Sequence, residues 1–116
     1  MSANETEAVT RHHIDALEAG DLEAVMSDYT EESVLIVPGA VMRGLDAIRP
    51  AFAAAFESSF KPGSSEFTLH SLDVCDDCSI ITWRITFDGG EIPFGTDTLY
   101  VRDGKIITQT GAVFMG

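Results

Sequence analysis

The side chains of this sequence best placed for chemistry are one aspartate and one histidine. Asp97 alternates in phase with Leu99 and Val101 in a strand pattern, so it shares their apolar face. A carboxylate on such a face is costly unless it is paired, protonated or lining a cavity. His13 lies one helical turn after Val9, so it faces inward with an apolar stripe. Carboxylate and imidazole groups can both serve in acid–base chemistry, and both are candidate catalytic residues.

A second candidate is the only C-x-x-C motif, formed by Cys75 and Cys78. Such a pair can be half of a zinc site or a redox pair, but zinc needs about two further ligands. His12, His13 and His70 lack the spacing of a zinc-binding histidine pair. The sequence favours two thiols near a strand turn. A disulfide across that turn is the alternative. We expect no metal and no cofactor.

Length and charge limit the classes of function. A chain of 116 residues with 45% hydrophobic content suits one domain over residues 1–116. The net charge of -12 repels phosphate backbones and anionic lipid, so we expect neither nucleic acid nor a membrane as partner. The acidic N-terminus has no apolar run behind it, which predicts no signal peptide and a cytoplasmic protein.

Helical spacing predicts three helices that position the histidine and the core. The first two cover residues 6–19 and 22–29, and the third opens at residues 44–46 and has its long regular part over residues 50–59. Gly20 is expected to end the first helix, and Asp21 to cap the second. Pro50 removes a backbone donor, so the long regular part of the third helix is expected to start there.

Strand patterns follow the helices and predict a sheet. The expected strands are residues 34–37, 41–43, 66–74, 79–87, 91–101 and 105–114. The last two are joined at Asp103–Gly104, which suits a tight hairpin turn, and Pro93 suggests a bulge or an edge position. Helices followed by a meandering antiparallel sheet indicate an α+β fold, with the sheet curved over the helices.

Strict alternation assigns the two faces of this sheet. The residues expected to face inward are Trp83, Ile85, Phe87, Leu99, Ala112 and Phe114. Those expected outside are Thr82, Arg84, Thr86, Thr98, Tyr100 and Gln109. The outer face is polar but carries little charge, so we expect two copies of the chain to form a homodimer through this face. The acidic residues Glu5, Glu7, Asp28, Glu31 and Glu32 are expected to form a solvated surface.

Several segments together resemble the nuclear transport factor 2-like (SnoaL-like) superfamily, over nearly the whole chain. They are Ala16-Leu-Glu-Ala-Gly-Asp-Leu22, Tyr29-Thr-Glu-Glu-Ser-Val34, Arg43-Gly-Leu-Asp-Ala-Ile48 and the Asp103–Gly104 hairpin. The superfamily includes ketosteroid isomerases and polyketide cyclases, and also non-catalytic binders. The resemblance implies a cone-shaped fold, in which a curved sheet wraps on helices around an apolar pocket open at one end.

The resemblance also implies site residues. In ketosteroid isomerases a strand Asp and a helix-one Tyr donate hydrogen bonds to a carbonyl oxygen. Asp97 matches that Asp, His13 stands at the Tyr position, and Val37 stands where the family has its general base. The implied site is thus a His–Asp pair without the isomerase base. Either a neutral Asp97 and His13 both donate to a ligand oxygen, or an ionised Asp97 orients His13 as a base, which we favour.

Two classes of function remain open from the sequence. One is a small enzyme of isomerase, cyclase or lyase type that acts on a hydrophobic small molecule through His13 and Asp97. The other is a non-catalytic ligand-binding or dimeric interaction domain, in which both residues are only buried polar groups with protein partners. The residues expected to contact a ligand in either case are Val37, Phe52, Phe56, Trp83, Leu99, Ala112 and Phe114.

Overall fold

The computed structural model describes residues 2–115, which form three helices and six strands. The helices are α1 (Ser2–Ala19), α2 (Leu22–Met26) and α3 (Leu45–Phe56). The strands are β1 (Val34–Val37), β2 (Ala40–Arg43), β3 (Ser65–Cys75), β4 (Cys78–Phe87), β5 (Gly90–Arg102) and β6 (Lys105–Phe114). Every predicted helix and strand is present, although several ends differ.

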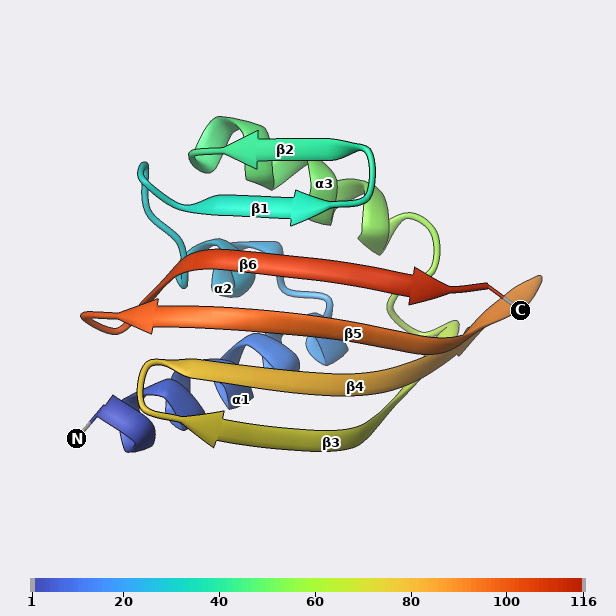
Figure 1. Ribbon diagram of the computed structural model, residues 1–116. Helices are drawn as coiled ribbons and strands as arrows, with labels where there is room; N and C mark the ends of the chain where they lie inside the picture. Colours follow the sequence, from blue (N-terminus) through green and yellow to red (C-terminus); the bar gives the residue numbers. More distant parts are fainter. Residues whose placement is uncertain (1, 116) are drawn as a thin grey trace.

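The strands form one mixed, open sheet in the order β2-β1-β6-β5-β4-β3. β1 runs parallel to β6, and the other neighbouring strands are antiparallel. Figure 1 shows all three helices on one side of the sheet, here called the inner side, and the opposite outer side uncovered. The predicted α+β arrangement of a curved sheet on N-terminal helices is confirmed.

The hydrophobic core fills the space between the helices and the inner side of the sheet. Leu99 and Val101 of β5, Ile106 of β6, Val25 of α2 and Ile48 of α3 are all fully buried. Burial of such apolar surface is the main favourable contribution to folding. α1 packs across β3, β4 and β5, so the helix that carries the candidate histidine lies against the strands that form the site.

A short joint of two residues separates α1 from α2. Gly20 has φ +68, and its N–H bonds to the Leu17 carbonyl while the Asp21 N–H bonds to the Ala16 carbonyl. This is the glycine-terminated helix end that the sequence predicts. The Asp21 side chain then accepts from the Ala24 N–H at 3.0 Å and caps α2 as predicted.

The third helix begins where the sequence predicts, at Leu45, but it differs from the prediction at Pro50 and at its end. It runs through Pro50 without a restart and ends at Phe56 rather than Ser59. A proline leaves the carbonyl four residues earlier, that of Asp46, without its helical partner. Asp46 and Pro50 both lie on the exposed side of the helix, where water can satisfy that carbonyl, so the helix continues through the proline.

A bulge in β6 reverses part of the predicted face assignment. Tyr100 pairs with Thr108 but Val101 pairs with Ile106, so Ile107 is an extra residue in β6. One extra residue turns every later side chain to the opposite face. Gln109 therefore points to the inner side and is 2% exposed, where strict alternation placed it outside.

The same bulge changes the face of Phe114 near the end of β6. Phe114 pairs with Phe94 and is 62% exposed, so it belongs to the outward-facing set rather than the inward one, whereas Ala112, which pairs with Thr96, still lines the pocket described below. A second irregularity lies in β5 beside Pro93, as the proline predicted. Strict alternation fails in this sheet wherever a strand contains an unpaired residue.

One acidic residue does not belong to the solvated surface. Asp28 is buried, and its carboxylate bonds to Nδ1 of His12 at 2.8 Å. Burial raises the pKa of Asp28, while the bond and charge of His12 and the charge of Lys105 oppose that rise. The pair links α1 to the segment after α2. The prediction that Asp28 is solvated is therefore wrong, because its carboxylate has a partner in the fold.

The cysteine motif lies at the turn between β3 and β4. Cys75 and Cys78 are exposed free thiols that face each other across Asp76 and Asp77. Within residues 2–115, no group of three or more histidine, cysteine or acidic side chains is arranged to hold a metal ion. Over the same residues, no helix has the length and apolar character needed to cross a bilayer.

Candidate functional site

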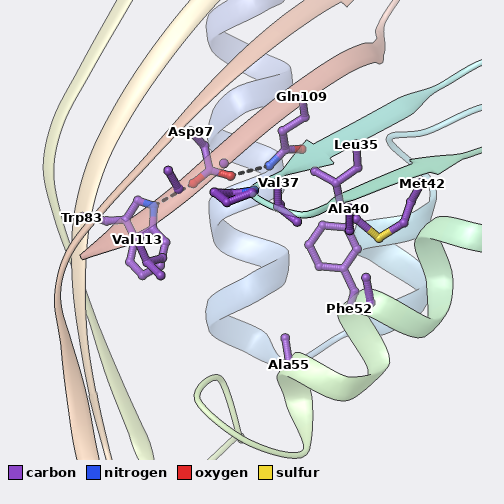
Figure 2. Close-up of a pocket in the computed structure, with 14 residues that line it drawn as sticks. Leu35, Val37, Ala40, Met42, Phe52, Ala55, Trp83, Asp97, Gln109 and Val113 are labelled. Atoms are coloured by element: carbon purple, nitrogen blue, oxygen red, sulfur yellow. Dashed lines mark hydrogen bonds between the residues drawn. The ribbon is translucent and has the colours of Figure 1, made fainter. Parts of the chain in front are cut away.

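A pocket of about 590 Å³ lies between α3 and the inner side of the sheet, with walls from β1, β2, β4, β5 and β6. Its walls are Leu35, Val37, Pro38, Ala40, Met42, Ala51, Phe52, Ala55, Trp83, Asp97, Gln109, Gly111, Ala112 and Val113. Figure 2 shows Asp97, Gln109 and Trp83 joined by hydrogen bonds on the sheet side. The remaining walls are apolar, so the polar groups of the pocket are concentrated at one place.

Asp97 is the titratable group of this pocket. Its Oδ1 accepts from Nε1 of Trp83 at 2.9 Å, and its Oδ2 accepts from Nε2 of Gln109 at 2.8 Å. Burial raises the pKa of the Asp97 carboxyl, while the bonds from Gln109 and Trp83 oppose that rise. Each carboxyl oxygen of Asp97 thus accepts one hydrogen bond, and burial has the larger effect, so the pKa is raised.

Two glycines make room for this arrangement. A Cβ atom on Gly95 would lie 2.3 Å from ring atoms of Trp83, and one on Gly111 would lie 2.9 Å from Oδ2 of Asp97. Gly95 pairs with Trp83 and Gly111 pairs with Asp97 across neighbouring strands. The indole and the carboxyl can therefore lie flat on the sheet because their strand neighbours have no side chain.

Tyr29 fixes the amide of Gln109. The hydroxyl of Tyr29 donates to Oε1 of Gln109, and both side chains are buried. Burial raises the pKa of Tyr29 well above its ordinary value, and the negative charges of Asp97 and Asp28 add to this, so the phenol stays protonated. An ionised carboxylate only accepts, so the amide nitrogen of Gln109 faces Asp97 and its oxygen faces Tyr29.

A second, inner cavity of about 110 Å³ adjoins the pocket. The two share Phe52, Ala55, Trp83, Asp97 and Gln109 as walls. His13 lines the inner cavity and is 1% exposed, and its Nδ1 has no hydrogen-bond partner among residues 2–115. Burial lowers the pKa of His13 to about 4, with a smaller contribution from His12, so the imidazole is neutral at pH 7.

The structure does not join His13 to Asp97 by a hydrogen bond within the described residues, although both line the inner cavity. The carboxyl oxygens bond to Trp83 and Gln109 instead. Gln109 reaches Asp97 because the β6 bulge turns it inward. The expected His–Asp pair is therefore replaced by a Trp–Asp–Gln group, with the imidazole apart from it.

Residues 10–109 match the family model described as the SnoaL-like domain. The chain belongs to the SnoaL-like domain family. The matched span contains Tyr29, Asp97 and Gln109, so the hydrogen-bonded group lies within the family domain. The predicted resemblance is confirmed at the level of family and fold. No curated protein matches the sequence significantly.

Solved structures show the same fold at low sequence identity. A nuclear transport factor 2-like protein of unknown function from Mesorhizobium loti has a TM-score of 0.83 at 24% identity, covering 98% of this chain and 94% of that one. A candidate ketosteroid isomerase from Kribbella flavida gives 0.83 at 17%, covering 99% and 82%. An epoxide hydrolase-like protein from Mycobacterium tuberculosis gives 0.76 at 14%, covering 98% and 86%.

Four of the predicted ligand-contacting residues line the pocket of this SnoaL-like domain. They are Val37, Phe52, Trp83 and Ala112. Three others lie elsewhere: Leu99 is fully buried in the core, Phe56 packs against the same core, and Phe114 is 62% exposed on the outer side. For Phe114 the cause is the β6 bulge. Alternation predicted correctly that Leu99 faces inward. It could not show that the helices cover this side chain completely and keep it out of the pocket.

Sequence reasoning missed Gln109 and Tyr29 as site residues of the SnoaL-like domain. Tyr29 follows α2 and is the last residue of the predicted second helix, where the sequence pattern carries no signal that points to the site. One signal for Gln109 was available: Ile106 and Ile107 are adjacent, and strict alternation would expose one of these isoleucines. Two neighbouring apolar residues conflict with strict alternation, and a bulge between them is one way to bury both.

Proposed function

We propose that this domain binds a hydrophobic, uncharged small molecule in the 590 Å³ pocket and that Asp97 acts on it as a general acid–base. A buried carboxyl held by two donors and facing an otherwise apolar pocket supports this proposal most strongly. Such pockets, with a few convergent polar groups, are typical small-molecule sites. The net charge of -12 disfavours an anionic ligand.

A single carboxyl is sufficient for reactions that move one proton. Ionised Asp97 accepts a proton from an acidic C–H or O–H of the bound molecule and returns it to another atom of the same molecule. Isomerisation, ring closure and elimination can proceed through such a transfer. Two similar structures carry names from related chemistry, a candidate ketosteroid isomerase and a candidate polyketide cyclase from Sinorhizobium meliloti.

His13 has a different place in this proposal from the one expected from the sequence. A neutral imidazole with a pKa of about 4 is a weak base at pH 7. It is also not oriented by Asp97. We therefore assign the proton transfer to Asp97 alone and treat His13 as a wall of the inner cavity.

The test compares the wild type with Asp97→Asn on a panel of cyclic unsaturated ketones, polyketide-like cyclic ketones and epoxides. Binding is followed by the fluorescence of Trp83, the single tryptophan, and turnover by chromatography. We expect Asp97→Asn to retain binding and to lose turnover by roughly 10²- to 10⁴-fold. Thr98→Ala, a neighbour on the outer side, serves as the control and should change neither quantity.

The binding of a hydrophobic molecule and the acid–base role of Asp97 can be disproved independently. If the wild type binds members of the panel but converts none of them, the domain is a binding protein and the acid–base assignment is wrong. If Asp97→Asn turns over as fast as the wild type, another group transfers the proton. If no compound of the panel binds, the assignment of a hydrophobic ligand is wrong.

A further inference from the structure

Three hydrogen bonds in the pocket point in one direction, toward Asp97. The Tyr29 hydroxyl donates to Oε1 of Gln109, Nε2 of Gln109 donates to Oδ2 of Asp97, and Nε1 of Trp83 donates to Oδ1. Figure 2 shows the last two bonds meeting at the carboxyl. Tyr29, Gln109 and Asp97 thus form a hydrogen-bond chain in which each group donates to the next and Asp97 accepts. Trp83 donates to the same carboxyl from the other side.

Gln109 is the member of this chain that can turn. An amide can present either its oxygen or its nitrogen to Asp97, because the two ends have nearly the same shape. If the oxygen faced Asp97, two acceptors would meet when the carboxyl is ionised. Tyr29 prevents this, since its buried hydroxyl keeps its proton and needs an acceptor, which only the amide oxygen supplies.

Tyr29 is itself held in place by packing. It is buried, and its ring lies 5.7 Å from that of Phe52 and 6.1 Å from that of His13, measured between centroids. Gln109 is fixed by the sheet, where it pairs with Leu99 on one side and Leu35 on the other. The hydroxyl and the amide therefore have little freedom to separate.

We propose that Tyr29 and Gln109 are positioning residues that together hold Asp97 as an acceptor and leave the pocket as the place where its proton is exchanged. Both protein groups that touch the carboxyl are N–H donors, and neither can accept a proton from it. A proton on Asp97 thus finds no acceptor among them. The proposal rests on the proposed function, since it describes how the same carboxyl is prepared for proton transfer.

The protein contains its own reporter for this arrangement. Trp83 is the only tryptophan, so the side-chain indole N–H gives one identifiable signal in a ¹⁵N-correlated NMR spectrum. That N–H bonds directly to Asp97, so its chemical shift follows the ionisation of the carboxyl. The titration needs no ligand and no substrate.

The experiment titrates this signal in the wild type, Gln109→Leu, Tyr29→Phe and the double variant. Gln109→Leu removes a donor to the carboxylate and should raise the midpoint by about one pH unit. Tyr29→Phe frees the amide to turn and should raise the midpoint by a smaller amount. Because Tyr29 acts through Gln109, the double variant should titrate like Gln109→Leu alone.

The control is Thr98→Ala, which alters a residue beside Asp97 in sequence but on the outer side of the sheet. Gln109→Met replaces Gln109→Leu if the leucine variant does not fold. An unchanged midpoint in the Gln109 variants overturns the proposal, and so does an effect of Tyr29→Phe that adds in full to that of Gln109→Leu. If the midpoints move as expected but no compound is converted, the positioning stands and the proposed activity fails.

Discussion

Among single residues, His13 is the side chain whose environment is least suited to its charged form. It is fully enclosed, its Nδ1 has no partner among residues 2–115, and burial lowers its pKa to about 4. An unfolded chain protonates a histidine near pH 6.5. Between pH 6.5 and 4 the unfolded state therefore binds more protons, so acidification through this range lowers the free energy of unfolding.

His13→Leu should remove this sensitivity. From the two pKa values, the wild type loses about 2 kcal/mol of stability between pH 7 and pH 5 through this group alone. The buried carboxyls of Asp28 and Asp97 have raised pKa values and act in the opposite direction, since acidification favours their folded, protonated forms. Urea unfolding at pH 7 and pH 5 measures the difference between the variant and the wild type. Parallel pH profiles for the two proteins would contradict the assignment.

The same variant should be at least as stable as the wild type at pH 7. Leucine fills a similar volume and leaves no buried nitrogen without a partner. A polar group that reduces stability where an apolar one would fit is typical of a functional position. A large loss of stability in His13→Leu at pH 7 would instead show that the imidazole has a bonding role in the fold.

Among the secondary structure elements, the close contact between β4 and β5 depends on one glycine. Gly95→Ala would place a Cβ atom 2.3 Å from the Trp83 ring, so the indole or the strand must move. We expect a loss of about 1–3 kcal/mol in the free energy of unfolding, together with a shifted tryptophan emission. Denaturant unfolding followed by fluorescence measures both.

Gly90→Ala is the matched control in the same strand. There the added Cβ atom would meet the Phe87 ring at 3.5 Å, which is an ordinary contact. The stability and the emission should stay close to those of the wild type. Equal losses in the two variants would mean that the general cost of alanine in β5, and not the indole, determines the effect.

The order and type of the elements could be predicted because local signals specify them. Gly20 and Asp21 mark the joint between α1 and α2, and each acts through its own backbone or side chain. The face of a strand residue beyond a bulge is different, because it depends on every residue before it. The single unpaired Ile107 moved Gln109 into the site and Phe114 out of it, so strict alternation misplaced both.

The candidate site was predictable in part for a related reason. Asp97 was identified because its conflict with an apolar face is visible in the sequence itself. Its partners come from β4 and β6, and only the pairing of strands brings Trp83 and Gln109 to it. The expected partner, His13, faces the same inner cavity but does not bond to the carboxyl. Inward direction could be predicted, whereas contact depended on tertiary packing.

At the scale of the whole molecule, the uncovered outer side of the sheet is the main unexplained surface. One row of paired residues across it is Ile36, Thr110, Thr98, Ile80 and Asp73. Ile36 is 38% exposed and Ile80 is 44% exposed. Four uncharged residues in line, on a chain with a net charge of -12, support the expectation of a homodimer through this side.

Light scattering after size-exclusion chromatography tests this expectation. The wild type should elute as a dimer, and Ile80→Glu should shift it toward the monomer because a charge would be buried at the centre of the contact. Ala3→Glu adds the same charge on α1, which lies on the helical side, and should leave the dimer intact. A monomeric wild type at micromolar concentration would rule out this use of the outer side.

The position of β6 has a consequence for how the chain reaches its fold. β6 is the last of the six strands in sequence, yet it lies between β1 and β5 in the middle of the sheet (Figure 1). During synthesis, the β1–β2 hairpin can form early, but β1 must wait for its other partner, β6, which is made about 70 residues later. Pairings of such long sequence separation form slowly. The pocket takes walls from both halves of the sheet, so in a nascent chain it is complete only after this final strand has been inserted.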